Sequence, residues 1–341
     1  IGRRGAAPRG FRGEGELQVS ADGYALKDMR ARIGRSDMAG ELAFSSAADR
    51  GMVRASLASD LLDLDDLLWL AREGGVAPRP STDALGNVAT EVPDFGALRR
   101  NDAELRIHAR RFHAAAYPLL QSLGLQATLN GGRLALAGID IGLGKGHVIG
   151  RAAVDWRSQP PAAEAELRWA GLHLQALWPD QPEDHRVTGA LQGTVAITAA
   201  GASGTALLQS ASGTLSASLV GGTIAGRLDA EMGLQGGRML SSLFGGGSER
   251  VAIRCAHAVL DVGGGRGRLR RFVVESELTR TTAVGSIGLV DQTLDVVLTP
   301  EARKGGLFVL ERSIRLHGPM RKPEHTLIDR RAPAPGSGCA A

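Results

Sequence analysis

Short runs in which apolar and polar residues alternate cover most of this chain, and clusters of glycine separate the runs. Leu134 and Leu136 alternate with alanines, and Leu294, Val296 and Leu298 alternate with Asp and Val. Because a β-strand points successive side chains to opposite faces, a period of two residues is typical of strands with one apolar and one polar face. The pattern therefore predicts a mostly β protein.

Turn signals lie between these runs, at Asp22-Gly23, Asn130-Gly131-Gly132 and Gly221-Gly222. Such turns join antiparallel strands in hairpins. Alternation alone leaves two arrangements open, a sandwich with a closed core and a sheet whose apolar face lines an open groove.

Helical spacing is rare. Leu and Trp residues recur at three- and four-residue spacing from Asp60 to Arg72, which predicts one short helix, and Leu228 to Phe244 is a weaker candidate because it contains glycines. The Pro- and Gly-rich span Glu73 to Leu98 predicts a long surface loop. The last ten residues, from Ala332, predict a disordered tail.

The length of 341 residues, of which 43% are hydrophobic, allows one large β domain or two smaller ones. The net charge is only +4, and the one basic stretch runs from Arg99 to Arg111. Nucleic-acid binding requires a basic stripe with stacking aromatics, whereas only 4% of the residues are aromatic. We therefore interpret this stretch as the polar face of a strand plus a loop and expect no nucleic-acid partner.

The two cysteines, Cys255 and Cys339, form no CxxC pair, so a zinc site has no support. From the residues alone, two free thiols and a single disulfide stay equally open. No run of about 18 apolar residues is present to span a bilayer as a helix. The chain starts at Ile1 rather than Met, and we interpret residues 1–16 as the leading segment of a truncated N-terminal region.

An internal repeat relates residues 17–67 to residues 125–177. When Gly40 is aligned with Gly150 and no gap is introduced downstream, Leu57 falls on Leu167. The residue pattern of each copy predicts several strands followed by a Leu-rich segment. Such a unit has to stack on another one to bury its apolar face.

Motifs of catalysis and cofactor binding are absent from the sequence. The stretch Gly142 to Gly146 resembles a phosphate loop, but Ile139 replaces the leading Gly and Gly146 replaces the Ser or Thr that would contact Mg²⁺. No nucleophile elbow or metal-binding His spacing occurs. The acids Asp63, Asp65 and Asp66 fit the start of a helix, where they stabilise its positive end. We expect a protein that is not an enzyme, with no cofactor and no metal.

Four segments, in the same order along nearly the whole chain, resemble the C-terminal half of the AsmA-like proteins of Gram-negative bacteria. They contain glycines, alternating Leu and turns, as in Ser212-Gly-Thr-Leu and Gly221-Gly-Thr-Ile. The segments are Gly34–Phe44 with Arg54–Leu67, Val92–Leu134, Gly204–Gly226, and Arg254–Pro323.

The resemblance implies a long, curled antiparallel sheet that forms an elongated open groove, in one β domain over residues 17–331. It also implies a periplasmic protein that an N-terminal segment, missing here, anchors in the inner membrane. Phospholipid is then the expected ligand, envelope proteins are further candidate partners, and phospholipid transport and outer-membrane biogenesis are the expected roles. The predicted groove lining is Leu134, Leu136, Ile139, Ile141, Val154, Trp156, Leu167, Trp169, Leu294, Val296 and Leu298.

Related members pair a cysteine in an Arg-Cys dipeptide with one near the C-terminus, so the resemblance implies a disulfide between Cys255 and Cys339. Two other functions stay open at this point. One is a structural or assembly role for outer-membrane proteins without lipid carriage. The other is an adhesin-like β-solenoid, although such a fold predicts a repeat much shorter than the one observed.

Overall fold

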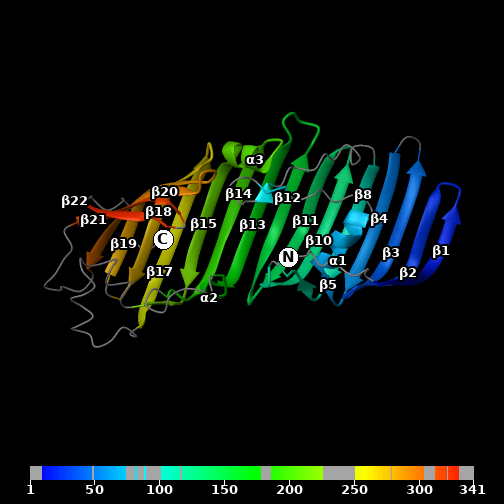
Figure 1. The fold of residues 1–341 in the computed structure, drawn as a ribbon, viewed down its shortest axis with the longest axis horizontal. Coiled ribbons are helices and arrows are strands. Elements are labelled where there is room, and N and C mark those ends of the chain that lie inside the picture. Colours follow the sequence, from blue (N-terminus) through cyan, green and yellow to red (C-terminus); the bar gives the residue numbers. More distant parts are fainter. Residues whose placement is uncertain are drawn as a thin grey trace, which may run out of the picture. The chain divides into compact units, whose positions relative to one another are not determined.

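The computed structural model describes residues 10–47, 50–73, 81–82, 88–89, 101–115, 117–177, 186–225, 250–277, 279–302, 312–320 and 322–329. The chain divides into two compact units. Unit 1 contains Ile1–Leu167 and Ala200–Gly204, and unit 2 contains Arg168–Ala199 and Thr205–Ala341. Most described residues of both units are in strands (Figure 1), so the predicted mostly β fold with few helices is confirmed.

Eight strands of unit 1 lie side by side in the order β1-β2-β3-β4-β8-β10-β11-β12. Most strands that follow one another along the chain form antiparallel hairpins, as the turn signals predicted. The bounds are β1 Phe11–Ser20, β2 Gly23–Ile33, β3 Ser36–Ala47, β4 Arg50–Ser59, β8 Asn101–Ala109, β10 Leu120–Asn130, β11 Arg133–Leu143 and β12 Gly146–Asp155. The next strand, β13 (Ala162–His173), contributes residues to both units.

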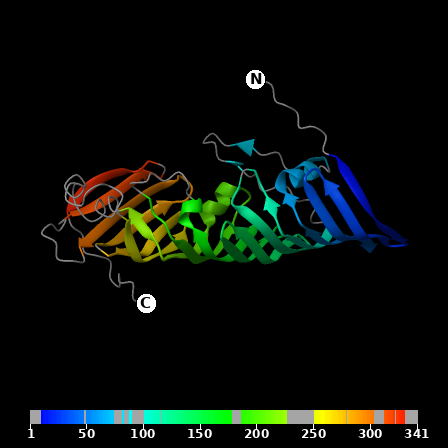
Figure 2. The same ribbon diagram turned by 90° about the horizontal axis from the view of Figure 1, so that it is seen from below.

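The pair β4–β8 departs from the predicted antiparallel pairing because its two strands are parallel. A parallel pair needs a crossover between its strands, and residues 60–100 provide it. The crossover holds β5 (Leu62–Asp63), α1 (Leu64–Glu73), β6 (Ser81–Thr82) and β7 (Val88–Ala89). Figure 2 shows α1 on one side of the unit-1 sheet.

The strand pairs described in unit 2 are all antiparallel, in the order β14-β15-β17-β18-β19-β20-β21-β22, with β16 also paired to β17. A core of Leu219, Ile224, Val251 and Ile253 lies where β15, β16 and β17 meet. The bounds are β14 Ala190–Ala200, β15 Ser212–Val220, β16 Thr223–Ala225, β17 Arg250–Gly263, β18 Arg266–Ser276, β19 Thr279–Gly288, β20 Thr293–Ala302, β21 Arg312–Pro319 and β22 Glu324–Asp329.

The predicted helix at Asp60 to Arg72 is present as α1, but it begins only at Leu64. The helix begins later than predicted because Leu62 and Asp63 form a parallel strand pair with β9 (Phe112–His113). The remaining helices of the described residues are α2 (Leu174–Leu177) and α3 (Gly204–Ser210). The candidate helix at Leu228 to Phe244 and the tail from Ala332 lie outside the described residues, as does most of the loop predicted at Glu73 to Leu98.

The two segments of the internal repeat have matching local structure. Gly34 and Gly144 occupy the turns that follow β2 and β11, with φ of +56° and +57°. Asp28 and Gly138, which are 110 residues apart like Gly40 and Gly150, both have positive φ, and each lies in a β-bulge of its strand. The first residues of α1 and α2 are also aligned. The repeat thus extends to backbone irregularities that the sequence alignment did not use.

Candidate functional site: an apolar sheet face

Cross-strand register places the apolar side chains of unit 1 on one face of its sheet. Leu134 lies opposite Leu129 on one side and Val154 on the other, and Ile107 lies opposite Leu57 and Leu125. We call this surface the unit-1 apolar face. Its larger members are Leu26, Leu42, Phe44, Val53, Leu57, Leu105, Ile107, Leu123, Leu125, Leu129, Leu134, Leu136, Ile139, Ile141, Val148 and Val154.

Most side chains of the unit-1 apolar face are only partly buried. Leu134, Leu136 and Ile141 are half-buried, while Ile139 and Leu129 are buried. A filled protein core buries its Leu and Ile side chains almost completely. A contiguous apolar surface that stays partly exposed marks a site of interaction. The exposure pattern therefore favours a face that other apolar groups can contact.

A β-bulge keeps the predicted lining residues of β11 on one face. Leu136 and Ile139 are an odd number of residues apart, so simple alternation would place them on opposite faces. Between them the register with β12 shifts, and Leu136 faces Ala152 whereas Ile139 faces Gly150. The extra residue in β11 restores the phase, so both side chains belong to the unit-1 apolar face.

One end of the unit-1 apolar face is covered by β5, α1 and β9. Ile33 and Ala109, at the ends of β2 and β8, are buried there, together with Leu62 of β5. The side chain of Ser36 is fully buried, and its hydroxyl accepts a hydrogen bond from the Asp63 N–H at 2.9 Å. The short crossover segment thus closes this end of the face.

Asp66 joins α1 to the turn between β2 and β3. Its Oδ2 accepts hydrogen bonds from the N–H groups of Arg35 at 2.8 Å and Ser36 at 3.0 Å, and from the Ser36 hydroxyl at 2.9 Å. The carboxylate lies so close that a Cβ on Gly34 would stand 2.4 Å from its Oδ1. Three donors satisfy a carboxylate that is almost fully buried, which makes the contact a structural one.

Asp63 and Asp37 complete this closed end. Asp63 accepts a hydrogen bond from the N–H of Asp65, as a helix N-cap does, and its Oδ2 lies 3.1 Å from Nδ1 of His113. Burial raises the pKa of Asp37, but hydrogen bonds from the N–H groups of Leu61 and Asp60 outweigh that effect and hold the pKa below its ordinary value.

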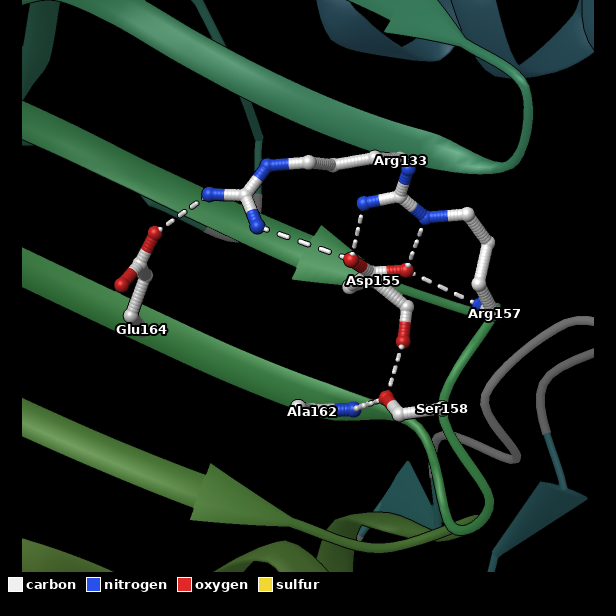
Figure 3. A network of polar contacts seen from close by, with 6 residues as sticks. All are labelled: Arg133, Asp155, Arg157, Ser158, Ala162 and Glu164. Carbon is white, nitrogen blue, oxygen red and sulfur yellow. Dashed lines mark hydrogen bonds and ion pairs between the residues drawn. The ribbon is translucent and has the colours of Figure 1, made fainter.

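The opposite face of the unit-1 sheet is polar and carries cross-strand ion pairs. Figure 3 shows Arg133 between Asp155 and Glu164, with Nη2 of Arg133 2.7 Å from Oε1 of Glu164. Hydrogen bonds from the side chain and the N–H of Arg157 hold the pKa of Asp155 below its ordinary value. A further pair joins Arg151 to Glu166 at 2.7 Å. These ion pairs lie on the solvent-facing side of the sheet, where each contributes little to stability.

The predicted lining residues fall in both units. Seven of them, from Leu134 to Leu167, are in unit 1, where Trp156 just past the end of β12 is buried, and Trp169, Leu294, Val296 and Leu298 are in unit 2. In unit 2, Val296 is buried between Gly285 and Leu316. Trp169 packs over Gly193, where a Cβ would stand 2.4 Å from the indole Cζ2. The predicted lining therefore divides into two sets of residues, one in unit 1 and one in unit 2.

The sequence-based prediction of the lining did not include the apolar side chains of β8 and β10, the two strands that precede β11 in the sheet. Leu105 and Ile107 alternate with the exposed Glu104 and Arg106 of β8, which confirms for Arg106 that the basic stretch contributes to the polar face of a strand. Arg99 and Arg100 lie outside the described residues. The same alternation could have identified Leu105 and Ile107. Leu123 and Leu125 of β10 were missed in the same way.

Cys255 on β17 is disulfide-bonded. Its predicted partner Cys339 lies outside the described residues, so the pairing of these two cysteines stays a prediction.

In the described part of the chain, no group of three or more His, Cys, Asp or Glu side chains is placed so that it could hold a metal ion. The Gly142 to Gly146 stretch is a hairpin turn between β11 and β12, not a loop before a helix. Among the described helices, none combines the length and the apolar character needed to cross a membrane.

These features define a predominantly β protein with a partly exposed apolar sheet face, a closed end and a polar outer face. The model of the AsmA family matches residues 13–271. The match covers more than half of the chain, and the chain therefore belongs to the AsmA family, which is associated with envelope biogenesis.

The AsmA family protein YhjG of Escherichia coli (strain K12) is 22% identical over 319 residues, which cover 88% of this chain and 46% of that protein. The chain thus spans about half the length of this curated relative. No solved structure matches the chain.

Proposed function

We propose that the protein binds the acyl chains of phospholipids on the unit-1 apolar face and takes part in phospholipid movement between the inner and outer membranes. In this proposal it acts in the periplasm, anchored in the inner membrane, without catalysing a reaction. The observation that carries the proposal is the partial exposure of Leu134, Leu136 and Ile141 on one continuous apolar face. Membership of the AsmA family supports the envelope setting.

The dimensions of the strands suit an acyl chain. Strands of ten or eleven residues, such as β10 and β12, extend over about 33 Å at ~3.3 Å per residue. One leaflet of a bilayer has a hydrocarbon thickness of about 15 Å, half of the ~30 Å core. An acyl chain can therefore lie along the strands between the end that α1 covers and the opposite end. Small and branched aliphatic side chains give such a surface little selectivity for one chain.

The experiment compares two double variants with matched chemistry on opposite faces. Leu136→Lys with Ile141→Lys places two positive charges on the unit-1 apolar face, whereas Thr128→Lys with Ala137→Lys places two positive charges on the polar face. Native mass spectrometry of the purified proteins and uptake of a fluorescent phospholipid measure binding. We expect bound phospholipid in the unmodified protein and the polar-face variant, and loss of it in the apolar-face variant. Absence of bound and added lipid from the unmodified protein would refute the proposal.

A further inference from the structure

Two neighbouring strands of unit 1 change from buried to exposed along the unit-1 apolar face. At the closed end, near α1, Ile33 of β2 is 3% exposed and Ser36 of β3 is fully buried. At the other end of the same two strands, Tyr24 is 53% exposed and Ser46 is also exposed. On these strands the face therefore has one end that the crossover segment covers and one end that is open to water.

The open end has a polar rim, which consists of Ser46, Gly51 and Asn101. Register places Ser46 of β3 opposite Gly51 of β4, which in turn lies opposite Asn101 of β8. This row follows directly after Phe44 of the apolar face. Tyr24 stacks on Phe44 with the ring centroids 5.3 Å apart, and a ring with a polar tip suits the boundary between an apolar surface and water.

The buried carboxylates at the closed end already have partners. Two N–H groups and a hydroxyl donate to Asp66, while Nη1 of Arg35 and Nδ1 of His113 lie 3.5 and 3.1 Å from Oδ2 of Asp63. A phosphate at this end would lose its hydration and stand near two carboxylates, and both effects oppose its binding. Hydrocarbon meets neither obstacle. The closed end therefore suits the ends of acyl chains better than a headgroup.

The apolar surface between the two ends has a length that fits one acyl chain. Strand β8 begins at Asn101 of the polar rim and ends at Ala109, which is fully buried at the closed end. The two residues are about 26 Å apart along the strand at ~3.3 Å per residue. Ala103, Leu105 and Ile107 lie between them on the apolar face and are partly exposed. The hydrocarbon of one bilayer leaflet, about 15 Å thick, can be placed on this stretch.

We propose that a phospholipid lies on the unit-1 apolar face in one orientation, with its headgroup at the polar rim and the ends of its acyl chains toward α1. The inference rests on the proposed function and adds a headgroup subsite to it. Arg50, Asp22 and Asp102 near the rim carry charges of both signs. The preference of the headgroup for this end therefore comes from its access to water and not from a fixed positive charge.

Two photoactivatable phospholipids test the orientation on the unmodified protein. One carries a diazirine at the end of an acyl chain, and the other carries it in the headgroup. Mass spectrometry of peptides locates the adducts after illumination. We expect the headgroup label at residues 22–24, 44–46 and 101–103, and the acyl-end label at residues 55–69 and 105–109.

The outcomes separate the orientation from the proposed function. Adducts of both labels at both ends, or at exchanged ends, would overturn the orientation and leave lipid binding to unit 1 intact. The absence of adducts from both labels, together with the absence of bound phospholipid, would refute the proposed function and this inference with it.

Ser46→Glu and Ser45→Glu test the headgroup subsite as a matched pair, because neighbours in a strand point to opposite faces. We expect Ser46→Glu, at the polar rim, to weaken the binding of phosphatidylglycerol about threefold through charge repulsion. Ser45→Glu on the polar face should leave this affinity unchanged. Diacylglycerol has the same acyl chains without the phosphate, and we expect it to bind both variants equally. Equal affinities of the two variants for phosphatidylglycerol would overturn the subsite.

Discussion

Gly40 approaches Ser56 on the neighbouring strand so closely that a Cβ at position 40 would lie 1.9 Å from the Ser56 carbonyl oxygen. The second copy of the repeat has the same contact, since a Cβ on Gly150 would lie 2.1 Å from the carbonyl oxygen of Glu166. Both glycines also have positive φ, at +147° and +154°. Each faces the residue that follows a β-bulge, Met29 in one copy and Ile139 in the other.

Gly40→Ala and Gly150→Ala are therefore expected to destabilise unit 1 strongly. The strained φ alone costs about 1–3 kcal/mol, and the strand must also move away from the carbonyl oxygen. Urea unfolding followed by circular dichroism measures the loss. Gly124→Ala is the matched control, because a Cβ there has its nearest neighbour at 3.5 Å. Equal midpoints for all three variants would contradict this account of the repeat.

Asp66→Ala is expected to detach α1 from the turn between β2 and β3. The substitution leaves the N–H groups of Arg35 and Ser36 without their carboxylate acceptor, at a cost of about 2–4 kcal/mol. Hydrogen exchange should accelerate at residues 34–36 and in α1. The equivalent position in the second copy is Ala176 in α2, so Ala176→Ser serves as a control that removes no carboxylate. Unchanged exchange at 34–36 would argue against the role of Asp66.

Asp37 gives the closed end a dependence on pH. Its folded-state pKa lies below the ordinary value of about 3.9. The ionised form is therefore the one that folding favours, and its contribution is complete above that ordinary value and is lost as the pH falls through the folded pKa. Asp37→Asn is expected to cost about 1–2 kcal/mol at neutral pH.

The difference between Asp37→Asn and the unmodified protein should shrink as the pH falls below about 4. Urea midpoints measured over this range give the comparison, and Glu41→Gln on an exposed position of β3 controls for the general effect of losing a negative charge. A difference that stays constant over the whole range would show that Asp37 does not act through its ionisation.

The pairing of Cys255 can be determined by peptide mapping. The chain has two cysteines, and Cys255 is disulfide-bonded. We expect digestion without reductant to release one linked peptide pair that contains Cys255 and Cys339, and reductant to separate it. Recovery of Cys339 in an alkylated, unlinked peptide without reduction would contradict the predicted pairing.

Local patterns in the sequence predicted the strands, the hairpin turns and α1, because each depends on neighbouring residues. They also predicted helix-start acids, and Asp63 does cap α1. The role of Asp66 could not be predicted in this way, since its partners Arg35 and Ser36 belong to a turn far upstream in the chain. The parallel pair β4–β8 and the division into two units likewise depend on contacts between distant segments.

In the candidate site, too, some features could be predicted from neighbouring residues and others could not. Alternation placed Leu134 and Leu136 together on β11, and Ile139 and Ile141 together, but it could not relate the two pairs to each other. The bulge at Gly138, with φ of +56°, decides that relation. Leu105 and Ile107 have the same alternating pattern. They were not predicted as lining residues because they lie in the basic stretch, which indicated only the polar face of a strand.

The bulge in β11 also makes the backbone conformation at Gly138 as important as the composition of that strand. Deleting Gly138 would leave Leu136 and Ile139 two residues apart, so that plain alternation would keep both on the unit-1 apolar face without a bulge. A substitution that keeps the number of residues but straightens the bulge would have the opposite effect and would turn Ile139 toward water and Asp140 inward. A β-branched residue, for which the positive φ of Gly138 is a strained conformation, should therefore be tolerated less well there than the deletion.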